Sequence, residues 1–136
     1  MQQKTMEVTN KELVTLLQGL HAVQGLKGLK FALAVSKNSK IIRDELEDIE
    51  IAATPSPEFI ELSRQVAEFE KKKDEKGIAN LEKKNKKLVE ERKTQLKELE
   101  EILKVKTEVK LVTITEDILP KDITAGQLSA IQTIVG

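Results

Sequence analysis

A heptad-like hydrophobic repeat runs through the middle of the chain, from about residue 57 to residue 104. Apolar residues recur there at alternating steps of three and four, which keeps them on one stripe of an amphipathic helix. Such a stripe packs on a partner helix, as the seam of a coiled coil does. We therefore expect an interaction surface made by Phe59, Leu62, Val66, Phe69, Ile78, Leu81, Leu88, Leu99 and Ile102.

The later half of the repeat departs from a strict zipper. Asn85, Arg92 and Gln95 occupy seam positions, while Leu96 and Leu103 widen the apolar surface to one side. A wide apolar face is typical of a helix in a bundle rather than of a two-stranded coiled coil.

A polar run at residues 71 to 77 separates the two halves of the repeat. It ends in Gly77, and helices often end at a glycine in the left-handed conformation. We predict a helical hairpin with its tip near residues 73 to 77. The alternative is one uninterrupted helix over residues 57 to 104, in which Gly77 would cost only ~1 kcal/mol relative to alanine.

The N-terminal part predicts two further helices. Thr9 and Glu12 have capping-box spacing, so one helix should begin at Asn10. A second is expected from about residue 30 to residue 52, although residues 29 to 35 also alternate as a strand would. Ser56 and Pro57 suit the cap and first turn of the helix that follows.

The hydrophobic period changes from 3.6 to 2 after residue 104. Residues 105 to 114 should form a strand that pairs with residues 4 to 9. A second capping box, Thr124 with Gln127, should open a last helix that buries Leu128, Ile131 and Val135.

Together these patterns predict one mostly α domain of the α+β class. A long helical hairpin or coiled-coil arm, residues 57 to 104, should join a small base, residues 1 to 56 and 105 to 136, whose short two-stranded sheet is formed by the N-terminal and C-terminal segments. With 136 residues, 2% aromatic residues and no cysteine, the chain needs an aliphatic core without disulfides. Its longest uncharged stretches have 14 residues, below the ~20 that span a bilayer, and its start lacks the apolar run of a signal peptide, so we expect a soluble protein with no membrane partner.

Charge is unevenly distributed although the net charge is zero. Residues 42 to 70 contain nine acidic and two basic residues, whereas residues 71 to 93 contain ten basic and five acidic ones. We favour charge pairing within or between subunits. The alternative is a contact with an anionic partner, made by Lys71, Lys72, Lys73, Lys83, Lys84, Lys86 and Lys87. We do not expect nucleic acid to be that partner, because no nearby aromatic side chain could stack on bases.

Catalytic and metal motifs are missing from the sequence. His21 is the only histidine, which excludes multi-histidine metal sites and fits a structural role. Gly19, Gly25 and Gly28 lack the Lys-Ser/Thr of a phosphate loop, and the acidic residues at 44 to 50 point around several helix faces. We expect no enzymatic activity, no cofactor and no bound metal.

The order of the parts resembles that of small proteins encoded by tailed bacteriophages. The likeness is carried by the segment 30 to 38 (KFALAVSKN), the charged segment 73 to 77 (KDEKG) and the segment 108 to 111 (EVKL). The resemblance implies a protein of the bacterial host cytoplasm or of the virion. One expected function is a structural or assembly component that forms homo-oligomers and contacts other phage or host proteins; the alternative is an early host-takeover or anti-defence protein that binds a host protein or sequesters a nucleotide signal.

Overall fold

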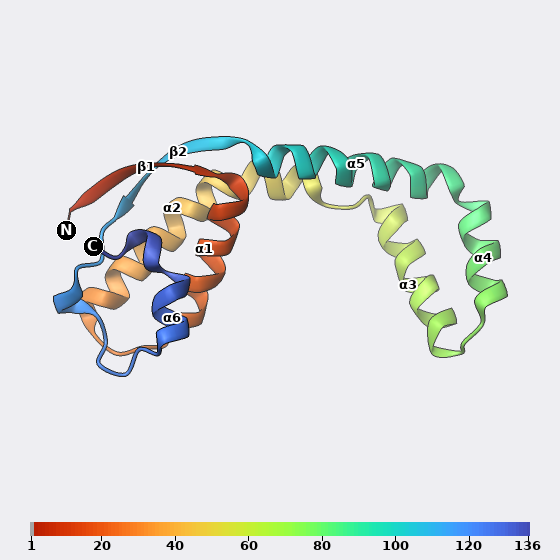
Figure 1. The fold of residues 1–136 in the computed structure, drawn as a ribbon. Coiled ribbons are helices and arrows are strands. Elements are labelled where there is room, and N and C mark those ends of the chain that lie inside the picture. Colours follow the sequence, from red (N-terminus) through yellow and green to blue (C-terminus); the bar gives the residue numbers. More distant parts are fainter. Residues whose placement is uncertain (1) are drawn as a thin grey trace. The chain divides into compact units, whose positions relative to one another are not determined.

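The computed structural model describes residues 2–136, and it confirms the α+β class with a two-stranded sheet made by the two ends of the chain (Figure 1). The elements in order are β1 (Gln3–Thr9), α1 (Asn10–Val23), α2 (Leu29–Ala53), α3 (Pro57–Lys71), α4 (Glu75–Lys84), α5 (Lys86–Lys104), β2 (Lys106–Val112), the 3-10 turn η1 (Glu116–Ile118), α6 (Ala125–Ala130) and the 3-10 turn η2 (Gln132–Ile134).

The chain divides into two compact units. The first unit comprises the chain up to residue 48 together with residues 102–136, and the second comprises residues 49–101. The sequence placed the division at residues 56 and 105, at a proline-containing linker and a change of period. The structure places it inside two helices, α2 and α5, each of which continues across it.

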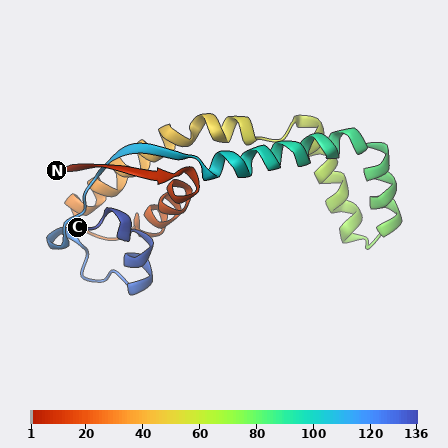
Figure 2. The same ribbon diagram turned by 45° about the horizontal axis from the view of Figure 1, so that its top comes forward.

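The sheet of the first unit pairs the start of the chain with a segment about a hundred residues later. Strands β1 and β2 are antiparallel, with Gln3 opposite Val112 and Thr9 opposite Lys106. Val109 and Leu111 are buried on one face of β2, as the period of two predicts. The predicted pairing of the two chain ends is therefore confirmed, and Figure 2 shows the two strands running side by side.

Helix α1 begins with the predicted capping box. The Thr9 hydroxyl accepts the Glu12 N–H at 3.1 Å, and the Glu12 carboxylate accepts the Thr9 N–H at 3.4 Å. The helix buries Leu13 and Leu20 against the core, and Gly19 allows α6 to approach closely. A Cβ at Gly19 would lie 2.6 Å from the carbonyl oxygen of Ala130, so only glycine fits there.

Residues 29 to 35 belong to helix α2, so the strand alternative for them is wrong. Gly28, with φ of +119°, lets the chain turn into this helix. Phe31, Ala34 and Val35 are buried at helical spacing, whereas Leu33, which strand alternation would have put on the same face, is 45% exposed.

The aliphatic core of the first unit gathers side chains from α1, α2, β2 and the C-terminal turns. Its members that are less than 2% exposed include Leu13, Leu20, Val23, Phe31, Ile42, Leu111, Val112, Ile114, Ile131 and Ile134. Asn38 is also fully buried, and its side-chain amide hydrogen-bonds both backbone polar groups of Val112.

The last helix is shorter than predicted. Its capping box, Thr124 with Gln127, is present, but α6 ends at Ala130, where Ile131 leaves the helical conformation. The chain then forms η2, which buries Ile134, while Val135 forms a parallel bridge with Ile114 and is only half-buried. Leu128 is half-buried as well, so of the three predicted core residues only Ile131 is fully enclosed.

The second unit contains the predicted helical hairpin, formed by α3 and α4, and the single-helix alternative is wrong. Ser56 caps α3 through the Phe59 N–H at 3.2 Å, and Pro57 begins the helix. Figures 1 and 2 show α3 and α4 side by side. Their connection differs from the prediction, because Lys73 adopts the left-handed conformation with φ of 56° and Gly77 lies inside α4. A Cβ at Gly77 would lie 2.7 Å from the Asp74 Oδ2 and 2.8 Å from the Phe69 ring, so a larger residue there would require these side chains to move.

The helical segment after the hairpin tip is not continuous, although the repeat predicted one helix over residues 78 to 104. Asn85, with φ of −113° and ψ of 29°, separates α4 from α5. Its side-chain amide donates to the Leu81 carbonyl at 2.9 Å, and the same carbonyl also accepts the Asn85 backbone N–H at 3.1 Å.

Candidate functional site

The hydrophobic stripe of the second unit is partly covered by the unit itself. Leu62 is buried at 4% exposure. Ile102, at the other end of the stripe, is 39% exposed and falls in the first unit. The remaining members are half-buried, namely Phe59, Val66, Phe69, Ile78, Leu81, Leu88 and Leu99. The hairpin therefore buries the stripe only in part, and apolar surface remains accessible along the stripe.

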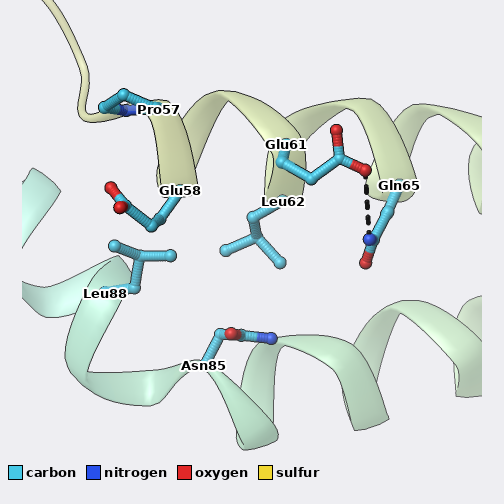
Figure 3. Close-up of a pocket in the computed structure, with 7 residues that line it drawn as sticks. All are labelled: Pro57, Glu58, Glu61, Leu62, Gln65, Asn85 and Leu88. Atoms are coloured by element: carbon cyan, nitrogen blue, oxygen red, sulfur yellow. Dashed lines mark hydrogen bonds between the residues drawn. The ribbon is translucent and has the colours of Figure 1, made fainter.

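A groove of about 420 Å³ opens on this stripe between α3 and the junction of α4 with α5. Figure 3 shows Leu62 pointing from α3 toward the opposite wall, where Asn85 and Leu88 lie. The α3 wall carries polar and acidic groups. Together the lining residues are Pro57, Glu58, Glu61, Leu62, Gln65, Asn85 and Leu88.

On the acidic wall, Glu61 is held by neighbours on the same helix. Arg64 donates hydrogen bonds to Glu61 and pairs with Glu68 at 2.6 Å, and Gln65 donates to Glu61 at 3.3 Å. These bonds, above all the one from Arg64, lower the pKa of Glu61 below its ordinary value, and the same carboxylates raise the pKa of Arg64. The Glu61 carboxylate is thereby fixed in place on the wall of the groove.

The polar seam residues of α5 have a structural role. Arg92 donates to the Ala53 carbonyl at 2.7 Å and Gln95 donates to the Ala52 carbonyl at 2.6 Å, so both satisfy carbonyls at the C-terminal end of α2. The Arg92 guanidinium also lies 5.9 Å from the ring centroid of Phe59. Arg92 and Gln95 therefore interrupt the hydrophobic repeat because their side chains cap the C-terminal end of α2.

The seven lysines of the basic segment are all exposed, and they fall into two groups. One group, residues 71 to 73, lies at the connection of α3 and α4, and the other, residues 83 to 87, surrounds the break at Asn85. The ten residues of α4 separate the groups by about 15 Å along its axis. The ion pairs in this region join residues of the same helix, as in Arg64 with Glu61 and Lys86 with Glu90 at 4.0 Å.

Sequence reasoning did not single out the acidic wall of the groove. Glu58 and Glu61 are three residues apart and both precede Leu62 within one helical turn, so a carboxylate pair beside a seam leucine was the available signal. His21 is exposed at the last turn of α1 instead of lying among leucines in the core.

Neither a cluster of metal-binding side chains nor a helix able to span a membrane is present among the described residues. Residues 2–136 hold no group of three or more His, Cys, Asp or Glu side chains that could bind a metal ion. None of the helices described is long and apolar enough to cross a membrane. Comparisons with protein families, with curated proteins and with solved structures find no match.

Proposed function

We propose that the protein acts without catalysis, through protein–protein contacts, and that it forms homo-oligomers through the groove of its second unit. The observation that carries the proposal is the half-buried stripe. A groove opens on it, with Leu62 and Leu88 in its lining and charged residues around it. Partly exposed apolar surface bordered by charge is typical of an interaction site.

A second copy of the chain is the occupant that the charges favour. The α3 wall of the groove carries Glu58 and Glu61, and the other wall lies between exposed lysines on both sides of Asn85. Around a twofold axis, the carboxylates of one copy would face the lysines of the other, and the same pairing would occur twice. Such a surface is complementary to itself, and its charges would fix the register while Leu62 and Leu88 supply apolar area.

In this proposal the protein is a phage structural or assembly component, as the resemblance implies. It should be present in purified virions in fixed stoichiometry with a known structural protein, which mass spectrometry of particles measures. A protein that is made early in infection and is absent from particles would instead be the host-takeover alternative.

Self-association is tested by size-exclusion chromatography with light scattering at tens of micromolar protein. We expect an oligomer for the wild type. Glu58→Lys with Glu61→Lys should give a monomer, as should Lys84→Glu with Lys87→Glu, because each pair of reversals places like charges together. Combining all four reversals should restore the oligomer, since the attraction is then re-established with exchanged signs.

Two further variants separate this surface from general charge effects. Lys71→Glu with Lys72→Glu makes the same charge change at the other end of α4 and should leave the mass unchanged. Leu88→Ala should weaken assembly by about 2–5 kcal/mol, provided that the leucine becomes fully buried in the oligomer. A monodisperse wild-type monomer, or charge reversals that have no effect on mass, would refute the proposal.

A further inference from the structure

We infer that α1 and α2 of the first unit form a binding groove for a small molecule that carries a phosphate group. Two adjoining hollows, of about 330 and 320 Å³, lie along these helices and share Ser39 and Arg43. The first is lined on the α1 side by Leu17, Gln18 and His21. The second continues past Gln24 and is lined on the α2 side by Ala32, Val35, Ser36 and Lys40.

From residue 13 to Arg43, the helices that line the groove carry only positive charge, after which α2 becomes acidic. Residues 13 to 43 contain five lysines and arginines and no aspartate or glutamate. Two of these cations, Lys40 and Arg43, line the hollows. Arg43 makes no ion pair or side-chain hydrogen bond with any residue of the described chain, and this includes Glu47 one turn further along α2. Its guanidinium therefore has all its donors available for an anion.

Ser39 gives a second and independent indication of a ligand. The residue is only 7% exposed, yet its hydroxyl has no hydrogen-bond partner within residues 2–136. No fully enclosed side-chain oxygen or nitrogen of the described chain lacks a partner, so this hydroxyl keeps some accessible surface, and Ser39 lines both hollows. A hydroxyl in a helix often bonds the carbonyl one turn back. That of Ser39 remains free to donate into the groove.

The chemistry of the lining selects a phosphate ester. A guanidinium binds phosphate oxygens through two parallel hydrogen bonds, and an ammonium adds a point charge. Arg43, Lys40 and the Ser39 hydroxyl together supply donors without an opposing carboxylate in the lining. Leu17 and Val35 offer apolar contact for the organic part of the ligand, and Gln18 and Gln24 can bond its polar edges. This inference concerns the first unit and does not depend on self-association.

The test is a titration of the full ¹⁵N-labelled chain followed by two-dimensional NMR. The probes are inorganic phosphate and adenosine 5′-monophosphate, at constant ionic strength maintained with chloride. We expect saturable shifts of the amides of Gln18, Ser39 and Arg43. Tighter binding of the nucleotide would identify a phosphate ester as the ligand, and equal affinity would identify the phosphate group alone as the element recognised.

Matched variants make the test specific. Arg43→Gln should weaken binding at least about tenfold, because a charge-assisted hydrogen bond is lost. Lys76→Gln removes the same charge from the second unit and should leave the affinity unchanged. Ser39→Ala should weaken binding while circular dichroism shows an intact fold. Shifts that do not saturate, or equal losses in Arg43→Gln and Lys76→Gln, would overturn the inference and indicate only general attraction of anions to lysines.

Discussion

Replacement of Asn38 by alanine should destabilise the first unit more than any surface substitution. The side chain is 0% exposed, and its amide contacts a single strand residue twice. Its Nδ2 donates to the Val112 carbonyl at 2.9 Å, and its Oδ1 accepts the Val112 N–H at 2.6 Å. Because both bonds face away from β1, Asn38 takes the place of a third strand at the end of β2.

The magnitude follows from the two groups that the substitution leaves unpaired. A buried donor or acceptor without a partner costs about 1–3 kcal/mol, so Asn38→Ala should lower the free energy of unfolding by about 2–6 kcal/mol. With a urea m-value of about 1–3 kcal/mol/M, the midpoint should fall by ~2 M. The loss is a large fraction of the stability of an ordinary domain, which is about 5–15 kcal/mol.

Asn38→Asp tests the same geometry through pH. Burial and the adjacent Val112 carbonyl should raise the pKa of the introduced carboxyl above its value in the unfolded chain. Protonated, this carboxyl can donate to the Val112 carbonyl and accept its N–H, as the asparagine does. The native state then binds the proton more tightly, so stability relative to wild type should be greatest below about pH 4. It should fall by up to ~1.4 kcal/mol per pH unit until the pH passes the raised pKa.

Unfolding is best measured by far-ultraviolet circular dichroism, since the chain has no tryptophan or tyrosine. Amide hydrogen exchange adds a local measurement, because the Val112 N–H should exchange much faster once its acceptor is removed. Asn80→Ala is the matched control. Asn80 is exposed on α4, and its replacement should change stability by no more than ~0.5 kcal/mol. An Asn38→Ala protein that unfolds at the wild-type midpoint with Val112 still protected would refute the argument.

Four further substitutions have expected outcomes, each measured by urea unfolding. Gly19→Ala should lower the free energy of unfolding by ~1–3 kcal/mol, since its Cβ would meet the Ala130 carbonyl at 2.6 Å. Gly25→Ala, where a Cβ has no atom within 4 Å, should leave it unchanged. Equal effects of the two substitutions would contradict the close approach of α1 and α6. Lys73→Gly should stabilise the hairpin by up to ~1 kcal/mol by relieving a φ of 56°, and destabilisation would show that the turn is not strained. Arg92→Leu should lower the free energy of unfolding by ~1–3 kcal/mol, because the Ala53 carbonyl at the end of α2 loses its hydrogen-bond donor. An unchanged stability would show that water replaces this donor.

Local patterns predicted most of the helices and both strands. The capping boxes at Thr9 and Thr124 and the period-two segment after residue 104 depend on groups within a few residues of each other, so they can be read along the chain. The hairpin was also predictable, but its turn geometry was not. Lys73 takes the left-handed conformation that the sequence suggested for Gly77, whereas Gly77 lies inside α4, close to the side chains of Asp74 and Phe69.

The candidate sites were less visible in the sequence. The stripe was apparent from its spacing, yet its pattern gave no sign of the break at Asn85 or of the groove that this break helps to line. The groove in the first unit depends on Ser39 and Arg43 of α2 meeting residues of α1 some twenty positions earlier. The lack of acidic residues from 13 to 43 is the only sequence signal for it.

The sequence by itself determined most of the secondary structure, because hydrophobic period, capping and β-branching act over a few residues. Tertiary structure decided which polar side chains serve as backbone partners. Asn38, Arg92 and Gln95 all interrupt apolar stripes, and each satisfies backbone groups that lie about forty or more residues away. A pattern along one helix cannot show which side chains bond to distant backbone groups, because an unpaired carbonyl or N–H becomes costly only when packing removes it from water.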